Sequence, residues 1–298
     1  MPCFKPIHGF HKLGGGIVFT PAGSNSIPLK IPCGQCIGCR TDKKLEWALR
    51  LHHESRSHAD SIFVTLTYAQ PHLPRGGTLV VSHGQCFMRR LRRLIHPHKV
   101  RFFLVGEYGD QNQRPHYHVI LFGYWPADAK LEGERETGKF YSSVLLSDAW
   151  GQKGFVEFSP ASPATMKYVS HYAVKRITGD MAKEHYTRLT ISGEFVQVIP
   201  EFARMSTRPG IGHQFMRDYQ EDIRNGDFCL MDGKKRPVPK YYDRVFKREH
   251  EAKLEAVKEL RREKARKRRA NNTPERLATR EQVATLKSKF NNGRRSAL

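Results

Sequence analysis

The stretch VRFFLVGEYGDQNQRPHYHVILFG (100–123) contains two runs rich in β-branched and aromatic residues around a polar segment. Such runs favour extended strands, and the segment GDQNQRP between them favours a reversal of the chain. The stretch therefore predicts an antiparallel hairpin with strands at 100–108 and 116–123.

Other segments extend this hairpin into a larger domain. SIFVTLTY (61–68) and GFVEFS (154–159) have the same strand-like composition. Helices are expected from Thr41 onward, over 83–95 and over 163–177, where apolar residues recur at helical spacing. Strands that outnumber helices indicate an α+β fold, with a central antiparallel sheet and flanking helices on one face.

Charge is the most unusual property of the composition. The 298 residues carry a net charge of +22, with 39% hydrophobic and 27% charged residues. A basic surface of this kind favours a polyanionic partner such as nucleic acid. The longest apolar runs fall well short of the roughly 18 residues that cross a bilayer, and MPCFKPIHGF lacks the apolar centre of a signal peptide. We therefore expect no membrane partner and a location inside the cell.

Half of that net charge lies in the segment from Arg244 onward, where 18 Lys and Arg residues accompany seven Asp and Glu residues. This segment is expected to be a solvated helix or a disordered basic arm, with or without a DNA-binding role. The candidate DNA contacts are Arg266, Lys267, Arg268 and Arg269.

Composition divides the chain into four expected parts. Residues 1–40 are rich in Gly and Pro and are expected to be irregular. The parts are a Cys-rich segment and helix (1–60), a core that contains the predicted hairpin (61–180), an accessory region (181–243) and the basic tail (244–298).

His116 and His118 flank one tyrosine on the second strand of the hairpin. Alternation along a strand places both imidazoles on the same side, where they can bind one divalent metal ion. Glu107 ends the preceding strand, and the hairpin brings it opposite the pair. Two histidines on a strand are often structural, so the carboxylate strengthens the metal interpretation. A second His-x-His, at 96–98, contains proline and lies in an expected loop.

Tyr168 and Tyr172 are four residues apart in the helix that Ser162 is expected to cap and Gly179 to end. This spacing places both phenols on one helix face. It also suits a plain core-facing aromatic stripe. A phenol becomes a competent nucleophile when a cation favours its ionised form, and Lys175 lies one turn beyond Tyr172.

Taken in order, FVTLTY (63–68), RPHYHVILFG (114–123) and YVSHYAVK (168–175) resemble the three motifs of His-hydrophobe-His (HUH) replication initiators with two tyrosines. CGQCIGCR (33–40) and MSTRPGIG (205–212) further resemble initiators of small single-stranded DNA phages, the gokushovirus-like Microviridae. The resemblance spans roughly residues 30–245.

The resemblance implies roles for particular residues. His116, His118 and Glu107 match the ligands of Mg²⁺ or Mn²⁺, Tyr168 and Tyr172 match the nucleophiles, and Lys175 matches the lysine that follows the second tyrosine. The implied activity is rolling-circle initiation: nicking and rejoining of single-stranded DNA at the phage origin through a 5′-phosphotyrosine, in the host cytoplasm. His171 departs from the pattern, because related proteins often carry lysine three residues after the first tyrosine. Tyr172, which is followed by the matching lysine, is therefore the better match to the family's nucleophile.

The implied cycle needs host proteins. A host polymerase would extend the free 3′ end. The sequence contains no G-x-x-x-x-G-K-[ST] motif of a P-loop ATPase, so a separate host helicase is expected to unwind the duplex.

Cys33, Cys36 and Cys39 form a C-x-x-C-x-x-C run that suits a soft metal. A closed zinc site needs a fourth ligand. Cys3 is the first candidate, and His8 or His11 is the next. An iron–sulfur cluster and a reduced loop without metal are the alternatives.

Other functions remain compatible with parts of this pattern. A relaxase or transposase would use the same site, and a DNA-binding protein could retain its residues without activity. Non-haem iron oxygenases also use two histidines and a carboxylate, but their usual spacing differs and they need no strongly basic chain.

Overall fold

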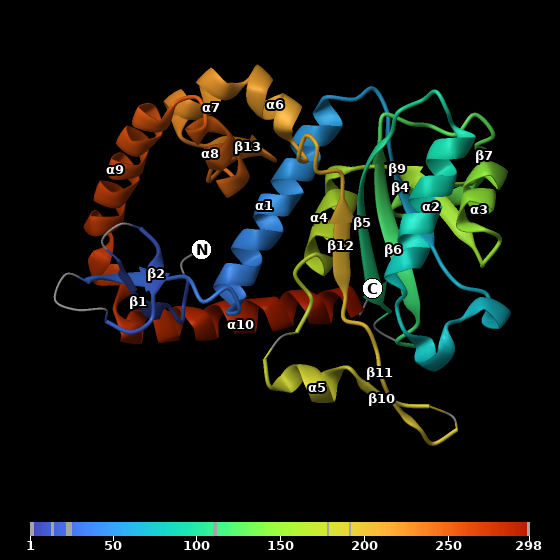
Figure 1. Cartoon of the computed structure of the whole chain (residues 1–298), viewed down its shortest axis with the longest axis horizontal. Coiled ribbons are helices and arrows are strands. Elements are labelled where there is room, and N and C mark those ends of the chain that lie inside the picture. The colour runs from blue at the N-terminus through green and yellow to red at the C-terminus, as the bar shows by residue number, and fades with distance from the viewer. Residues whose placement is uncertain are drawn as a thin grey trace. The chain divides into compact units, whose positions relative to one another are not determined.

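The computed structural model describes residues 3–12, 15–21, 26–109, 112–177, 179–190 and 192–296. By compactness the chain divides into two units (Figure 1). The larger unit is Glu46–Tyr242, and the smaller combines Met1–Leu45 with Asp243–Leu298. Each unit is described by itself.

A seven-stranded antiparallel sheet forms the centre of the larger unit. Four of its strands are those that the sequence predicts, with ends shifted by at most two residues. In spatial order the strands are β12 (Phe202–Met205), β5 (Arg101–Tyr108), β6 (Pro115–Phe122), β4 (Ser61–Leu66), β9 (Val156–Pro160), β8 (Gly138–Ser142) and β7 (Lys130–Arg135). The α+β class is therefore confirmed.

Helices cover both faces of this sheet, so the expectation of helices on one face was wrong (Figure 1). The reason is that β5 and β6 are buried on both sides rather than alternating between core and solvent. One face packs on α2 (Val81–Leu94) and α3 (Val144–Trp150). The other packs on α1 (Ile37–Arg56) and α4 (Pro163–Tyr172).

The ends of two helices differ from the sequence prediction. Helix α1 begins at Ile37 rather than Thr41, because helical hydrogen bonding already starts with the Arg40 amide donating to the Cys36 carbonyl. Helix α4 begins after Ser162, as expected, with Ser162 and Thr165 capping each other's backbone amides. It ends at Tyr172, well before Gly179, because the chain then tightens into turns.

The expected accessory region contributes β12 to the edge of the sheet. The segment after β12 is held by a buried carboxylate. Glu54 accepts from the Gly212 amide at 2.5 Å and pairs with Arg101, which donates to the Pro209 carbonyl at 2.9 Å.

The remaining elements of this unit are the short helices η1 (Gln70–His72), η2 (Arg75–Gly77), α5 (Met181–His185), α6 (His213–Asp218) and α7 (Gln220–Gly226), and the strands β10 (Thr187–Leu189), β11 (Phe195–Gln197), β13 (Cys229–Met231) and β14 (Lys234–Arg236).

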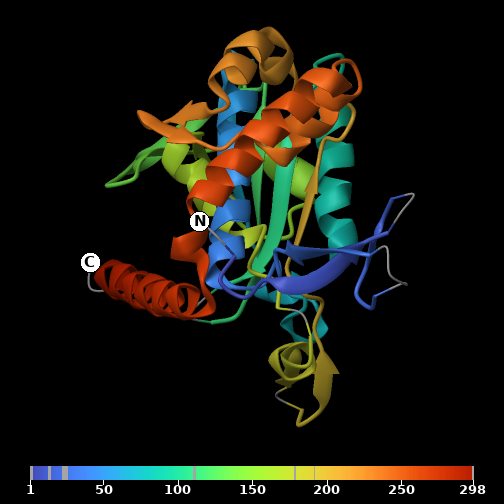
Figure 2. The same ribbon diagram turned by 90° about the vertical axis from the view of Figure 1, so that its left-hand side faces the viewer.

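The smaller unit contains a three-stranded sheet that the sequence analysis did not expect (blue in Figure 2). Its strands are β1 (Ile7–His11), β2 (Ile17–Val18) and β3 (Ile27–Ile31). The prediction of irregular structure over 1–40 was therefore wrong. Glycine and proline outweighed the weak strand signal of these short runs, which are stabilised by pairing with strands elsewhere in the segment.

The basic tail is helical where it is described. The chain leaves the larger unit in α8 (Lys240–Lys247) and continues through α9 (Glu251–Lys267), η3 (Arg269–Asn272) and α10 (Pro274–Ser296). Helix α9 is covered by charged residues, and most of its side chains are exposed. Within the described residues no helix is both long and apolar enough to cross a membrane.

Candidate metal and nucleophile site

The β5–β6 hairpin brings together three side chains that the sequence analysis singled out. In the antiparallel ladder Glu107 lies opposite His116, and Val105 lies opposite His118. Strand β4 places Thr65 on the other side of His118. Because residues two apart on a strand share a face, Glu107, His116 and His118 all project from the face that carries α4.

The three side chains converge on one point. The Nε2 atoms of His116 and His118 each lie 2.8 Å from Oε1 of Glu107. Glu107 and His118 are buried, whereas His116 is partly exposed. One ligand atom from each residue can therefore approach a single ion.

The other ring nitrogens show which form each imidazole takes. Nδ1 of His116 lies 3.1 Å from the Arg114 carbonyl, which can only accept, so this nitrogen carries the hydrogen. A neutral His116 then presents the lone pair of Nε2 toward Glu107. Nδ1 of His118 lies 3.2 Å from the Thr65 hydroxyl, which is the kind of partner that orients a metal-binding imidazole.

An imidazole lone pair and a negatively charged carboxylate repel each other at this distance. A cation between them would remove the repulsion. The second oxygen of Glu107, Oε2, is buried and has no hydrogen-bond partner among the described residues. A buried carboxylate oxygen without a partner is costly, and a divalent metal ion would satisfy it. Two imidazoles and a carboxylate therefore fit a metal that retains open positions.

Burial and hydrogen bonding act in opposite directions on these groups. Burial raises the pKa of Glu107, but without a metal ion hydrogen bonds donated by His116 and His118 would outweigh that effect and hold the pKa below its ordinary value. Burial lowers the pKa of His118, and Glu107 offsets this only in part. A charged Glu107 beside a neutral His118 is the state that a metal ligand set requires.

Helix α4 carries the two tyrosines over this group. The rings of Tyr168 and Tyr172 lie 5.2 and 6.0 Å from the ring of His118, and 4.8 Å from each other, between centroids. Tyr172 is 8% exposed and Tyr168 is 42% exposed. Both phenols therefore share one neighbourhood with the histidines, and one of them is much more open to solvent.

Lys175 lies in the turn after α4 rather than on the helix itself. Its Nζ is 5.1 Å from the centre of the Tyr172 ring and donates to the Tyr108 carbonyl at 3.4 Å. The cation is thus held beside the second tyrosine. His171, the residue that departs from the family pattern, is exposed and lies next to Tyr172, with 5.6 Å between ring centroids.

Three contributors to the site were missed in the sequence. Thr65 contacts the second histidine, Arg114 supplies the carbonyl behind the first, and Phe63 stacks on His118 with centroids 5.0 Å apart. Phe63 and Thr65 alternate in FVTLTY, which marks one face of the strand. The signal was present, but nothing in one sequence indicates which face lies toward the histidines.

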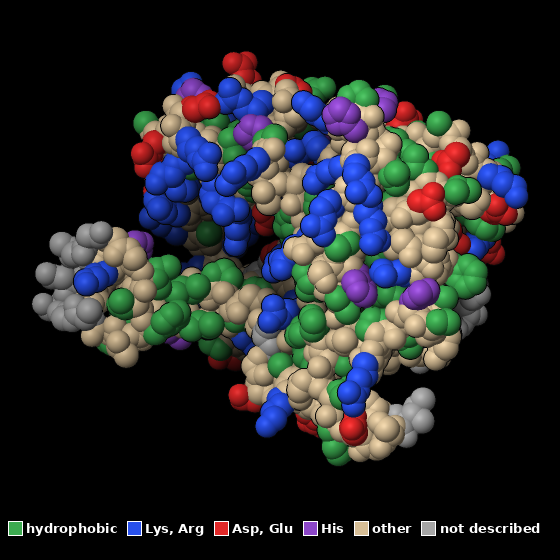
Figure 3. Space-filling model, turned by 45° about the vertical axis from the view of Figure 1, so that its right-hand side comes forward, with side chains coloured by type: hydrophobic (Ala, Val, Ile, Leu, Met, Phe, Trp, Pro, Cys, Tyr) green, Lys and Arg blue, Asp and Glu red, His purple; other side chains and the backbone are tan. Residues whose placement is uncertain are grey.

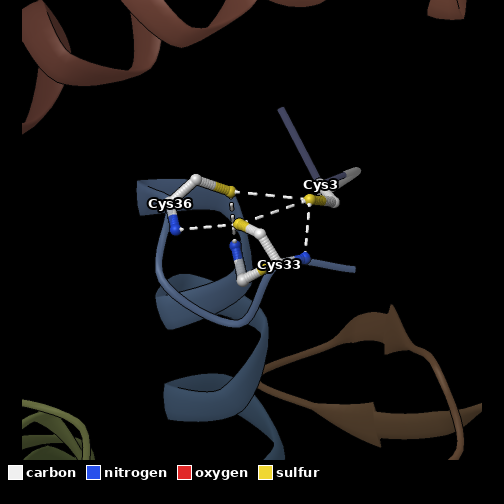
Figure 4. Close-up of side chains that lie close together, drawn as sticks. Cys3, Cys33 and Cys36 are labelled. Carbon is white, nitrogen blue, oxygen red and sulfur yellow. Dashed lines mark hydrogen bonds between the residues drawn. The ribbon is translucent and has the colours of Figure 1, made fainter. Parts of the chain in front are cut away.

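The four cysteines named in the sequence analysis also lie together, in the smaller unit. One sulfur from each of Cys3, Cys33, Cys36 and Cys39 lies within 4.8 Å of the others, and none is in a disulfide (Figure 4 shows three of them). His8 and His11, the alternative ligands, are on β1 and are not part of this group.

Ionisation of these thiols is uneven. Burial raises the pKa of Cys36, but backbone amides of Cys39 and Phe4 lower it to about 6. Burial and the neighbouring sulfurs of Cys3 and Cys36 raise the pKa of Cys39 to about 12. Without a cation, ionisation of one cysteine therefore makes ionisation of its neighbour less favourable.

The candidate DNA contacts of the tail lie around the end of α9. Arg266 and Lys267 pair with Glu259 and Glu263, at 3.3 and 3.2 Å. Arg268 and Arg269 are exposed and have no acidic partner among the described residues.

Comparison with known proteins finds related sequences over the region that contains this site. Residues 61–177, which contain all six candidate catalytic and metal-binding residues of the larger unit, match the family described as replication-associated protein ORF2/G2P. The chain is 33% identical over 255 residues to replication-associated protein ORF2 of Spiroplasma virus 4, covering 80% of this chain and 74% of that protein.

Two further relatives have the same kind of name. Replication-associated protein VP4 of Bdellovibrio phage phiMH2K is 29% identical over 261 residues, 84% of this chain and 78% of the relative. Replication-associated protein ORF4 of Chlamydia phage 1 is 35% identical over 159 residues, 51% of this chain and 39% of the relative. No solved structure matches the chain. The chain therefore belongs to the phage replication-associated protein family and is a replication initiator of the small single-stranded DNA phage type.

Proposed function

We propose that this initiator nicks and rejoins single-stranded DNA through a 5′-phosphotyrosine. The observation that carries the proposal is the placement of two phenols, on α4, beside a His–His–carboxylate group on the β5–β6 hairpin. Nucleophiles positioned next to a metal-binding group suit phosphoryl transfer to a protein side chain.

Mg²⁺ or Mn²⁺ is the metal that we assign to His116, His118 and Glu107. When bound, it would polarise a phosphate oxygen and stabilise the charge that develops there. The protein's own contribution is to hold the ligands in place before DNA arrives: Arg114 and Thr65 orient the two imidazoles, and burial keeps His118 neutral.

The chemical step is a transesterification. A tyrosine oxygen attacks the phosphorus of the scissile phosphodiester, the bond from phosphorus to the 3′ oxygen breaks, and the 5′ phosphate becomes linked to tyrosine. The phenol loses its proton and the departing 3′ oxygen gains one, which leaves a free 3′-OH. The Lys175 ammonium beside Tyr172 favours the ionised phenol.

Two tyrosines permit two successive attacks at one site. We assign the first role to Tyr172, which has the lysine beside it, and the second to the more exposed Tyr168. After a host polymerase has extended the 3′-OH and a host helicase has displaced the old strand, the second tyrosine would cleave the new junction. The freed 3′-OH then attacks the first phosphotyrosine and closes the circle.

The surface charge suits the substrate. Lys and Arg side chains gather on the face drawn in Figure 3, and the whole chain carries +22. Contacts with phosphates would hold single-stranded DNA without reading its bases, and Arg266, Lys267, Arg268 and Arg269 are candidates for such contacts. We place this activity in the host cytoplasm.

A covalent protein–DNA adduct is the direct test. Purified protein is incubated with single-stranded DNA segments tiled across the source genome and with Mn²⁺ or EDTA, then resolved on a denaturing gel. Wild type is compared with Tyr168→Phe, Tyr172→Phe and the double variant. Tyr219→Phe, which alters an exposed tyrosine outside the site, is the control.

We expect an adduct that needs Mn²⁺, persists in Tyr219→Phe and disappears in the double variant. If Tyr172→Phe alone abolishes it, Tyr168 acts only in the later step. A protein that binds every DNA segment but forms no adduct would refute the nicking proposal and would identify an inactive DNA-binding protein.

A further inference from the structure

The smaller unit holds its four sulfurs on two segments far apart in sequence. Cys3 lies near the start of the chain, Cys33 and Cys36 precede α1, and Cys39 lies in the first turn of that helix. The close-up in Figure 4 shows the side chains of Cys3, Cys33 and Cys36 turned toward one another. Three of the four thus come from one tight turn, and the fourth closes the group from outside it.

The spacing between sulfurs is that of ligands around one ion. Sγ of Cys3 lies 3.6 Å from Sγ of Cys33 and 3.9 Å from Sγ of Cys36. Tetrahedral zinc, with bonds to sulfur of about 2.3 Å, separates its ligand sulfurs by about 3.8 Å.

Backbone amides point at these sulfurs. The amides of Cys33 and Cys36 donate to Cys3 and Cys33 at 3.2 and 3.3 Å, and those of Phe4 and Cys39 donate to Cys36 at 3.3 and 3.5 Å. Amide donors stabilise negative sulfur, which is the form that binds metal. The turn is therefore built to hold thiolates and not merely to bury thiols.

We propose that Cys3, Cys33, Cys36 and Cys39 bind one zinc ion in a closed, structural site, and that this ion organises the smaller unit. Four sulfur ligands leave no position for water or substrate, so the ion has no catalytic role. This inference concerns a separate metal and does not rest on the nicking proposal.

Residues from the N-terminal and the C-terminal part of the smaller unit pack together beside the sulfurs. Phe4, Cys36 and Leu277 form one small buried cluster, against which Ile37 of α1 and Ala284 of α10 pack. Lys5 adds an ion pair with Glu281, at 3.5 Å. A cluster of this size buries too little apolar surface to order α10 by itself. The binding energy of a four-sulfur zinc site is large enough to supply what is missing.

Metal analysis of the full chain tests the site. Wild type is purified without chelator, and zinc and iron are measured by mass spectrometry. It is compared with Cys36→Ser, with His116→Ala/His118→Ala and with Cys86→Ser, a cysteine outside the cluster. Co²⁺ substitution of wild type gives a second reading that needs no variant.

We expect one zinc per chain in wild type, in the double histidine variant and in Cys86→Ser, and below about a tenth of that in Cys36→Ser. Bound Co²⁺ should give the charge-transfer and ligand-field bands of tetrahedral sulfur. Zinc that disappears with the histidines instead would place it at the other site and overturn the proposal. Iron with the colour of an iron–sulfur cluster, or reduced protein without metal, would also overturn it.

Hydrogen exchange tests the structural consequence. Removing zinc with a chelator should raise amide exchange in α10 and β1 at least tenfold and leave β6 unchanged, because β6 belongs to the larger unit. Unchanged protection of α10 after complete loss of zinc would show that the ion does not organise this unit.

Discussion

The two candidate metal sites of this protein differ in what surrounds them. The Glu–His–His group lies on neighbouring strands of a seven-stranded sheet that helices cover on both faces. The Cys₄ group lies on a turn and a chain end, beside a cluster of three buried residues. The first has a scaffold that hydrophobic burial builds without metal, and the second has almost none.

This difference teaches how each site is expected to use its ion. On the sheet, the proposed ligands are in place beforehand and two tyrosines lie beside them, so a bound metal would be free to act on a substrate. Around the sulfurs, every ligand position is filled by the protein, so the metal is left with a structural task. Loss of metal should then abolish chemistry at one site and order at the other.

The strongest test of this contrast is His118→Ala. We expect the rate of adduct formation to fall by about a thousandfold or more, because a ligand is lost where phosphate charge must be stabilised. Circular dichroism and the melting temperature should change little, since the sheet does not depend on the metal. His98→Ala, in the second His-x-His, is the matched control. A variant that unfolds would break the contrast.

Thr65→Val tests the same Glu–His–His group with a smaller change. Its hydroxyl orients His118 without touching the metal, so we expect a loss of roughly 10- to 100-fold in Mn²⁺ affinity. Titration of Mn²⁺ against adduct rate measures this, and excess Mn²⁺ should restore the rate. Thr67→Val removes a hydroxyl that contacts the Phe155 carbonyl instead, and should leave the affinity unchanged. Equal effects of both substitutions would refute the orienting role.

Protons rather than metal should control the stability of the larger unit. Burial, and then the charge of His52, lowers the pKa of His53 from 6.5 to about 3. Below pH 6.5 the unfolded chain therefore binds a proton that the folded chain does not. The free energy of unfolding should fall by about 1.4 kcal/mol per pH unit from this residue as the pH drops toward 3.

Urea unfolding between pH 7 and 5 measures that slope. His53→Gln should be less stable at pH 7 but show a shallower dependence on pH. His72→Gln, at an exposed histidine, should keep the wild-type slope. Identical slopes in wild type and His53→Gln would show that His53 does not cause the pH dependence.

The smallest expected effect concerns the tail. Arg268→Ala/Arg269→Ala should reduce the slope of log affinity against log salt by about 1.4, because single-stranded DNA contributes about 0.7 per phosphate contact. Arg266→Ala/Lys267→Ala removes the same charge, but these two residues already pair with glutamates, so the reduction should be smaller. Fluorescence anisotropy over a salt series distinguishes the pairs. An unchanged slope in both would identify a solvated tail without a DNA contact.

Much of the candidate site could be predicted because it depends on short-range geometry. The two-residue period of a strand and the reversal at GDQNQRP suffice to place Glu107 opposite His116. The four-residue spacing of Tyr168 and Tyr172 suffices for one helix face. Which face of the sheet α4 covers is a tertiary property, and only the resemblance to known initiators linked the tyrosines to the histidines beforehand.

The missed strands show the limit of local patterns. β7 is polar and exposed, and β12 has four residues with an arginine among them. Their pairing is decided by the strands they join and not by their own composition. The same holds for β1, β2 and β3, where each strand is short and its partner lies several residues away.

Helix α4 and the β5–β6 hairpin have separate places in the sequence, and this separation has an evolutionary consequence. In the proposed mechanism the helix carries the nucleophiles and the hairpin carries the metal-binding residues, so mutation could add, remove or move a tyrosine without disturbing a ligand. An initiator with one tyrosine and an initiator with two can thus be neighbours in sequence space. The number of strand transfers per cycle becomes a trait that selection can tune one helical turn at a time.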